Sequence, residues 1–186
     1  MAVTTLDPRT ALIVVDLQKG IIAAPFVHSI NEVVAQARAL ADAFRQRGLP
    51  VVLVNVAGGA PGRTEQPPRN LAAMPADWTD FIPEIGQQPG DIVVTKRTWG
   101  AFASTDLEVR LKTAGVTQVV VTGVATGTGV EATARQAYEA GFNVTLAIDA
   151  MTDGRAAAHD HSLAHVFPRL GETGTARDII ALLGAP

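Results

Sequence analysis

The sequence predicts a single three-layer α/β/α domain with a mostly parallel, Rossmann-like sheet. Short, nearly continuous apolar runs alternate along the chain with amphipathic helical patterns. This alternation is typical of βαβ units, whose parallel strands are buried on both faces. The 186 residues suit one domain with a sizeable core, and no repeat or linker divides them. We therefore expect one domain over residues 1–186.

The first half of the chain contains three expected strands and one long helix. Residues 11–15 (ALIVV) form an apolar run that ends at Asp16. Residues 30–47 place apolar side chains on one helical face, and Gly48 follows as a stop signal. The other two strands are expected at residues 51–56 and 91–95, and a long glycine- and proline-rich loop covers residues 57–70. Loops of this length in compact domains are usually functional or disordered.

The second half continues the same alternation. The strands are expected at residues 117–122 and 143–148, with a short extended piece at 169–174. The helices are expected at residues 107–114, 130–140, 155–166 and 176–183. Gly115 and Gly141 end the first two of these helices, and Thr175 is a suitable cap for the last.

Composition excludes several classes of protein. The net charge is −3 and there is no basic run, so we expect no nucleic-acid partner. The apolar stretches are far shorter than the roughly 20 residues of a membrane span, and the first ten residues lack a signal-peptide pattern. The expected location is therefore cytoplasmic and the expected partner a small-molecule substrate. The chain has no cysteine, which excludes disulfides, thiolate metal sites and cysteine nucleophiles.

A ligand is expected at the carboxyl ends of the strands, where open α/β sheets bind them. The glycine-threonine turn in residues 121–135 (VTGVATGTGVEATAR) lies at such an end and admits two interpretations. In the first, Gly127, Gly129 and Ala132 match the dinucleotide pattern G-x-G-x-x-A, with Asp149 as the ribose acid. Against it, four residues separate the strand from the first motif glycine, and the unit lies late in the chain. These glycines also serve any tight turn.

In the second interpretation the turn is a catalytic one without its nucleophile. Three segments carry this hypothesis: residues 11–20 (ALIVVDLQKG), residues 94–107 (VTKRTWGAFASTDL) and residues 122–153. Together they resemble the isochorismatase-like hydrolases, also called the cysteine hydrolases, over nearly the whole chain. The resemblance implies a catalytic aspartate at Asp16 and a catalytic lysine at Lys96, and it places the family's cysteine at Gly129.

Family members that cleave isochorismate also have glycine at this position. The resemblance therefore implies acid-catalysed hydrolysis of a vinyl ether, in which Asp16 is the general acid and Lys96 holds a substrate carboxylate or oxygen. It also implies a cis peptide at Val124–Ala125, and an anion on the amides of residues 127–130. The substrate is expected to contact the following residues: Gln18, Trp99, Phe102, Val124, Ala125 and Thr128.

The resemblance also bears on cofactors and assembly. Nicotinamidases bind zinc through a D-x-H that has no counterpart here, because the second strand ends Asn55-Val56-Ala57. No cofactor is therefore expected. Members of the family form dimers or larger rings, so we expect a homo-oligomer. The expected contacts are the loop from Gly58 to Asn70 and residues 78–85 (WTDFIPEI), in which Trp78, Phe81 and Ile82 look exposed.

Simpler alternatives stay open for each candidate. Asp16 could cap a turn, Lys96 could lie at the surface, and Trp99 and Phe102 could pack in the core. A non-catalytic relative could keep the pocket and bind ligand without turnover. Three histidines, His159, His161 and His165, suggest a metal site but lack the glutamate of H-E-x-x-H, so a solvent-facing or subunit-contact helix is the alternative. Four further charged residues, Arg63, Arg97, Asp149 and Asp153, are expected to be solvated, to meet substrate charge, or to brace the site.

Overall fold

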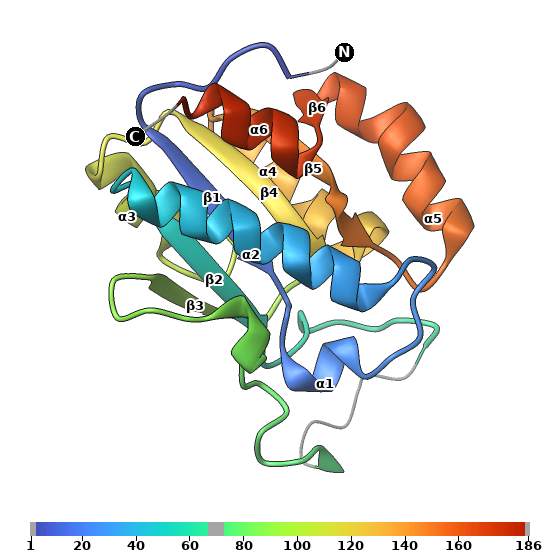
Figure 1. Ribbon diagram of the computed structural model, residues 1–186. Helices are drawn as coiled ribbons and strands as arrows, with labels where there is room; N and C mark the ends of the chain where they lie inside the picture. Colours follow the sequence, from blue (N-terminus) through green and yellow to red (C-terminus); the bar gives the residue numbers. More distant parts are fainter. Residues whose placement is uncertain (1–2, 67–72, 185–186) are drawn as a thin grey trace.

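The computed structural model describes residues 3–66 and 73–184, which form one six-stranded sheet covered by helices (Figure 1). The strand order is β3-β2-β1-β4-β5-β6, and the neighbouring strands all pair in parallel. The strands are β1 (Thr10–Val15), β2 (Val51–Val56), β3 (Ile92–Lys96), β4 (Gln118–Val124), β5 (Asn143–Thr152) and β6 (Glu172–Gly174). The predicted α/β class is confirmed.

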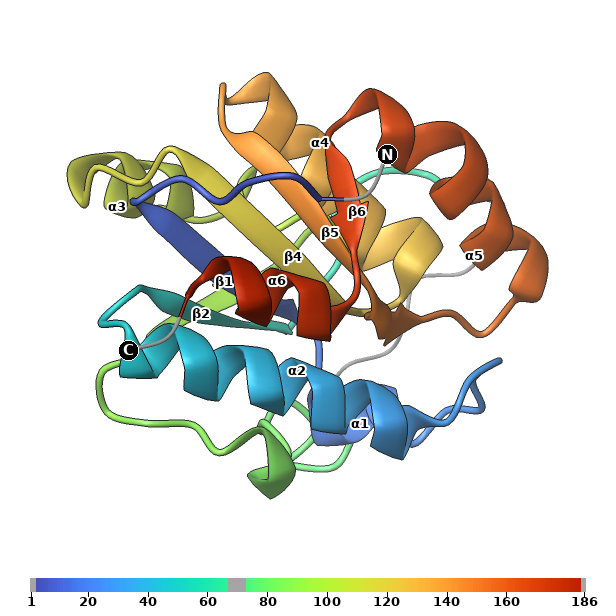
Figure 2. The ribbon, with the colours of Figure 1, turned by 45° about the horizontal axis from the view of Figure 1, so that its top comes forward.

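The helices are arranged in two layers, one on each face of the sheet (Figure 2). The α-helices are α1 (Lys19–Ile22), α2 (Ile30–Gln46), α3 (Leu107–Thr113), α4 (Glu131–Glu139), α5 (Ala156–His161) and α6 (Ala176–Leu182). The part of the chain that the structure describes also contains two π-helical segments, η3 (Thr126–Val130) and η4 (Ser162–Val166), and two 3₁₀ turns, η2 (Pro83–Ile85) and η5 (Phe167–Arg169). None of the helices in the described ranges is long and apolar enough to cross a membrane.

The sheet separates two apolar cores, and β1 contributes to both. Its residues are all buried, with Ile13 and Val15 in one core and Leu12 and Val14 in the other. The first core contains the inner faces of α3 and α4, and the second those of α2 and α6. Since successive strand side chains point to opposite faces, a strand covered on both sides has no polar face to show. This explains the unbroken apolar run of the sequence.

Helix α2 follows its sequence pattern closely. Its buried residues recur every three or four positions, and Gly48 just beyond its end has a φ of 63°. A left-handed residue at this place is the usual way in which a helix ends, and glycine adopts it without a Cβ penalty. The buried set is Val33, Val34, Ala37, Leu40, Ala41 and Phe44.

The strand order fixes where a ligand site can lie. From β1 the chain builds β2 and β3 to one side, and it then returns to place β4 on the other side of β1. Connections that leave β1 and β4 therefore diverge, and open α/β sheets bind ligands in the crevice at such a switch point. Asp16 directly follows β1, and η3 directly follows the residue after β4.

One expectation about an element is wrong, and one short helix was not expected. Strand β5 does not end at residue 148 but runs to Thr152, because the chain leaves the register of β4 after Leu146 and rejoins it at Met151. Asp149 thus lies within the strand, and its Oδ1 accepts a hydrogen bond of 2.7 Å from the amide of Ala176 at the start of α6. The short helix α1 carries too few residues for a period to be visible in the sequence.

Residues 78–85 are not the exposed contact segment that their sequence suggests. Trp78 and Ile82 are only 7% and 5% exposed. The Trp78 ring lies so close to Gly20 that a Cβ there would be 2.0 Å from its Cδ1, which requires glycine at this point. Phe81 pairs with Gln18 in an isolated antiparallel bridge. The segment therefore packs on its own chain; part of the other expected contact, the loop from Gly58 to Asn70, lies outside the described residues.

Candidate active site

A buried ion pair joins Asp16 and Lys96 at the carboxyl end of the sheet. Asp16 follows β1 and Lys96 ends β3, so the pair spans the end of β2, which lies between these strands. Lys96 Nζ lies 2.8 Å from Asp16 Oδ2, and the two side chains are 2% and 8% exposed. Lys96 Nζ also donates to the carbonyl of Thr98 at 3.4 Å. An ammonium in such a place needs both a countercharge and hydrogen bonds to offset its lost hydration.

The backbone of Asp16 is held in an uncommon conformation. Its φ is 54°, and it is the one residue other than glycine with a positive φ in the described ranges. Its amide donates to the Val54 carbonyl at 2.8 Å, which extends the β1–β2 ladder by one bond. Aspartate tolerates the left-handed region better than most residues, and residues held there cluster at functional sites. The conformation is thus consistent with a functional role for Asp16.

The glycine turn approaches the ion pair from β4. The peptide Val124–Ala125 is cis, as the resemblance implied. Residues 126–130 then make one π-helical turn that leads into α4 without a break. Gly123 has a φ of 111°, and a Cβ there would lie 2.1 Å from the Val15 carbonyl oxygen. Only glycine allows β4 and β1 to approach this closely just before the turn.

Gly129 faces the Asp16–Lys96 pair. A Cβ built on Gly129 would lie 3.1 Å from each of three atoms: Asp16 Oδ2, the Val124 carbonyl oxygen and Val15 Cγ1. Gly129 is not among the residues with positive φ, so its backbone is one that any residue could adopt. Glycine at this position therefore permits close packing of the turn against the carboxylate rather than an unusual backbone conformation.

The amides of the turn are largely used by the protein itself. The Gly127 amide donates to Asp153 Oδ2 at 2.8 Å, and Asp153 is 4% exposed. The amides of Thr128 and Val130 donate to the Ala125 carbonyl at 3.1 and 3.2 Å. The expectation that residues 127–130 offer their amides to an anion is therefore wrong for these three, because the π-helical turn and Asp153 already satisfy them. Asp153 braces the turn.

The same observations weigh against the dinucleotide hypothesis. A sheet with this strand order binds a dinucleotide at the turn after its first strand. Here β1 is followed by Asp16, whereas the glycine turn follows β4. The amide of the first motif glycine, Gly127, also already has Asp153 as its acceptor.

The other candidate residues fall into separate environments. Gln18 is fully buried, donates to the carbonyls of Val56 and Trp78 at 3.2 and 3.1 Å, and accepts from the Val56 amide at 2.7 Å. It thus ties the ends of β1 and β2 to the segment around Trp78. Phe102 packs in the core with its ring 5.9 Å from that of Phe142, whereas Trp99 is 68% exposed. Val124 is fully buried, and Ala125 and Thr128 are half-buried in the turn.

The two arginines considered for substrate charge are both exposed. Arg97 donates to the Ala57 carbonyl at 3.3 Å. This contact fixes the start of the loop after β3 against the end of β2.

A histidine pair that the sequence did not suggest lies beneath the turn. His159 is 5% exposed, its ring lies 4.7 Å from that of His28, and its Nδ1 lies 2.9 Å from the Thr126 hydroxyl. Burial, reinforced by the neighbouring His28, holds the pKa of His159 below its ordinary value of 6.5. His161 and His165 form a second, exposed pair 5.3 Å apart. Within residues 3–66 and 73–184 no cluster of histidine and acidic side chains could hold a metal ion.

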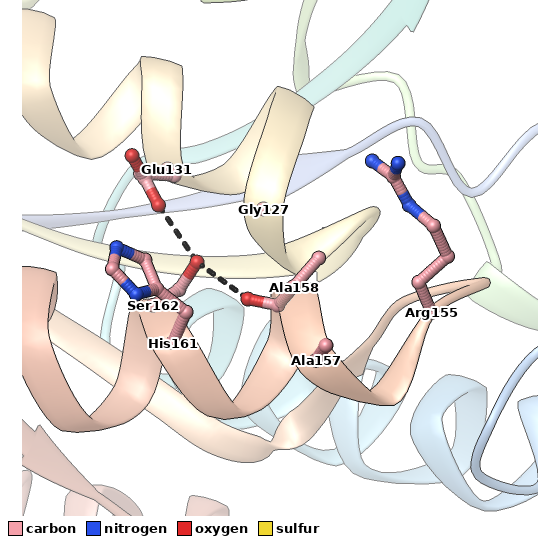
Figure 3. A pocket seen from close by; sticks show the side chains of 7 residues that line it. All are labelled: Gly127, Glu131, Arg155, Ala157, Ala158, His161 and Ser162. Carbon is pink, nitrogen blue, oxygen red and sulfur yellow. Dashed lines mark hydrogen bonds between the residues drawn. The ribbon is translucent and has the colours of Figure 1, made fainter.

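A shallow pocket of about 450 Å³ lies on the other side of the turn, between α4 and α5 (Figure 3). Ser162 donates to Glu131 Oε2 at 2.7 Å on one side of it, and Arg155 extends away from this pair on the other side of Gly127. Neither Asp16 nor Lys96 lines it. We assign the candidate active site to the ion pair, because the pocket holds no comparable buried charges. Its lining residues are Gly127, Glu131, Arg155, Ala157, Ala158, His161 and Ser162.

Comparison with known proteins shows the family to which the chain belongs. The protein-family model of the isochorismatase domain matches residues 10–178 of the sequence. An uncharacterized isochorismatase family protein of Bacillus subtilis, YwoC, is 40% identical over 178 residues, which cover 92% of this chain and 93% of the relative. A ureidoacrylate amidohydrolase, RutB, of Methylobacterium radiotolerans is 30% identical and covers 97% of this chain and 82% of the relative.

A solved structure extends the agreement to three dimensions. An isochorismatase family protein from Burkholderia thailandensis superposes with a TM-score of 0.91 and 44% identity, covering 97% of this chain and 98% of that one. The family model spans both strands that supply the ion pair and the whole glycine turn. The chain therefore belongs to the isochorismatase family and is a hydrolase of that family.

Proposed function

We propose that this protein hydrolyses a small vinyl ether without a protein nucleophile, with isochorismate as the leading substrate. The observation that supports the proposal is the place of Gly129, whose backbone lies beside Asp16 Oδ2 where a Cβ would be crowded by three atoms at 3.1 Å. The chain contains no cysteine, so a thioester cannot form. A reaction in which water is the nucleophile suits a site that combines a carboxyl group and an ammonium but has no side-chain nucleophile at Gly129.

The proposed reaction begins with proton transfer from Asp16 to the methylene carbon of the enol ether. An oxocarbenium ion results, and water adds to its electron-poor carbon and returns a proton to the Asp16 carboxylate. The hemiketal then breaks its C–O bond to the ether oxygen on the ring, its hydroxyl proton passes to that oxygen, and pyruvate and a dihydrodiol leave. Lys96 contributes by attracting a substrate carboxylate to the reacting centre.

The pairing of Asp16 with Lys96 suggests how the acid form arises. An ammonium at 2.8 Å favours the ionised carboxylate. When a substrate carboxylate engages Lys96, that ammonium is shared and the negative charge near Asp16 increases. Both changes favour the protonated form of Asp16. A dianionic substrate would thus help to prepare its own general acid.

The relatives named as ureidoacrylate amidohydrolases suggest amide hydrolysis as another chemistry for this fold. In this chain such a reaction would also require water as the nucleophile. A second candidate function is ligand binding without turnover. It is favoured by the tight burial of the Asp16–Lys96 pair, in which each charge already has the other.

The test is to incubate the protein with isochorismate and follow pyruvate release. Asp16→Asn is the variant of choice, because asparagine also tolerates a positive φ. We expect its turnover to fall at least about 100-fold. Lys96→Met should raise KM and lower kcat, whereas Lys112→Met, at an exposed lysine paired with Glu108, is the matched control and should be silent. No pyruvate from the wild type would remove isochorismate as the substrate.

We also propose that residues 1–186 act as one cytoplasmic domain that forms a homo-oligomer, with a small molecule as partner and neither nucleic acid nor membrane. Several large apolar side chains support the oligomer by their exposure: Trp99, Val109 and Tyr138 are 68%, 68% and 54% exposed. Light scattering coupled to size exclusion tests it, and a monomeric mass at micromolar concentration would contradict it.

A further inference from the structure

The loop that follows Lys96 is hydrogen-bonded to helix α4, which directly follows the glycine turn. The first fastening is the Thr133 hydroxyl, which is fully buried. It donates to the Gly129 carbonyl at 2.6 Å and accepts from the Ala101 amide at 3.2 Å. A bond from threonine back to the carbonyl four residues earlier is common in helices, but it does not require the second partner. Here one hydroxyl joins the turn at Gly129 to the loop of Lys96.

The second fastening is Gln136, one helical turn further along α4. Its Oε1 accepts from the amides of Phe102 and Ala103 at 2.9 and 3.3 Å. The approach depends on Gly100, because a Cβ there would lie 2.3 Å from Gln136 Oε1. Three successive loop amides are therefore bound by two side chains of one helix.

The loop in turn bears on Lys96. Its residue Thr98 accepts from Lys96 Nζ through its carbonyl at 3.4 Å, and the Thr98 hydroxyl donates to the Gly100 carbonyl at 2.9 Å. A continuous chain of hydrogen bonds thus runs from Gly129 through Thr133 and the loop to the ammonium of Lys96. The chain of hydrogen bonds thus joins the loop after β3 to η3 and α4, which follow β4.

We propose that Thr133 and Gln136 form a positioning clamp that sets Lys96 relative to Gly129 and Asp16. The proposal rests on the assignment of these three residues as the reacting centre, and it adds which residues hold them in register. Displacements of about 1 Å in a reacting geometry can cost on the order of 100-fold in rate. A clamp of this kind would act on kcat more than on KM, since neither side chain is proposed to touch the substrate.

The test compares Thr133→Val, which keeps the shape and removes the hydroxyl, with Thr133→Ser, which keeps the hydroxyl. Gln136→Leu and Gln136→Glu are the corresponding pair at the second fastening. Thr145→Val is a matched control: Thr145 is also fully buried and accepts from Gln118 Nε2 at 3.0 Å, but it lies near the opposite, amino end of the sheet. It reports the cost of losing a buried hydroxyl as such.

Two readouts need no substrate. The first is hydrogen exchange of the Ala101 amide, which we expect to speed up on the order of tenfold in Thr133→Val but not in Thr133→Ser or Thr145→Val. The second is competitive acetylation of the three lysines under native conditions. Labelling of Lys96 should rise in Thr133→Val and Gln136→Leu relative to the exposed reference lysines Lys19 and Lys112.

The third readout is pyruvate release from isochorismate. We expect kcat to fall about 10- to 100-fold in Thr133→Val with KM little changed, and to recover in Thr133→Ser. If the wild type releases no pyruvate, the proposed function is wrong. Hydrogen exchange at Ala101 and acetylation of Lys96 still test the clamp in that case. Unchanged exchange at Ala101 and unchanged labelling of Lys96 would overturn it, as would equal effects in Thr145→Val.

Discussion

The buried pair of Lys96 and Asp16 makes a stability prediction that needs no knowledge of the substrate. Replacing Lys96 with methionine keeps the length of the side chain and removes its charge. The Asp16 carboxylate, 8% exposed, then loses the ammonium 2.8 Å away. Breaking a buried ion pair on one side costs about 3–5 kcal/mol. Because both side chains are nearly inaccessible, solvent screening does not reduce this figure to that of a surface pair.

The assay is urea-induced unfolding, with thermal unfolding as a second measure. For a chain of this length about 1 kcal/mol corresponds to about 2–4 °C, so Lys96→Met should lower Tm by about 6–20 °C. Asp16→Asn should cost a similar amount, because the buried ammonium then keeps a hydrogen bond of 3.4 Å to the Thr98 carbonyl but loses its countercharge.

The double variant Asp16→Asn/Lys96→Met tests directly whether the two charges interact. It removes both charges, so its cost should be smaller than the sum of the single costs by about 0.5–3 kcal/mol. Lys112→Met, at an exposed pair, should stay within about 0.5 kcal/mol of wild type. A cost for Lys96→Met no larger than that for Lys112→Met, or single costs that simply add, would contradict a coupled buried pair.

Three further predictions concern the turn, the histidine pair and the last helix. Gly123→Ala should lower the free energy of unfolding by more than about 3 kcal/mol or prevent folding, because it puts a Cβ 2.1 Å from a carbonyl oxygen at a φ of 111°. Gly59→Ala, with open space around it, is the control in the same urea unfolding assay. Because the pKa of His159 is lowered in the folded protein, the unfolded chain binds more protons than the folded one below about pH 6.5. The free energy of unfolding should therefore fall as the pH drops from there. Urea titrations across that range should show a flatter pH profile for His159→Gln than for the wild type. Thr175→Ala removes one half of a capping box with Asp178 and should cost about 1 kcal/mol by the same titration, whereas no loss would mean that the cap is not a stabilising one.

The strands and long helices were predictable because each buries a continuous or periodic set of its own residues. The run at residues 11–15 and the stripe on α2 are local patterns, and both reappear within a residue of their expected ends. The end of β5 was not predictable, since Met151 rejoins β4 only after an irregularity that leaves no trace in the sequence.

The site was predictable in part. Residues that belong to short sequence motifs could be named, whereas contacts between residues far apart in the sequence could not. Asp16 and Lys96 could be named from short motifs, and the ion pair brings them together. The burial of Trp78 was not predictable, because the residue that it packs against, Gly20, is far away in the sequence. The His28–His159 contact, too, joins distant segments, and local patterns do not carry such information.

The position of β3 at one end of the strand order has a consequence for how the enzyme fails on heating. Lys96 is supplied by this outermost strand, which among residues 3–66 and 73–184 pairs with β2 alone and leaves Val93 40% exposed. Outer strands open at lower cost than the centre of a sheet, which here carries Asp16 and the glycine turn. Loss of the lysine from the site can therefore precede global melting, so that inactivation begins several degrees below Tm and reverses on cooling. A neighbour that covered the free side of β3 would bring the two temperatures together.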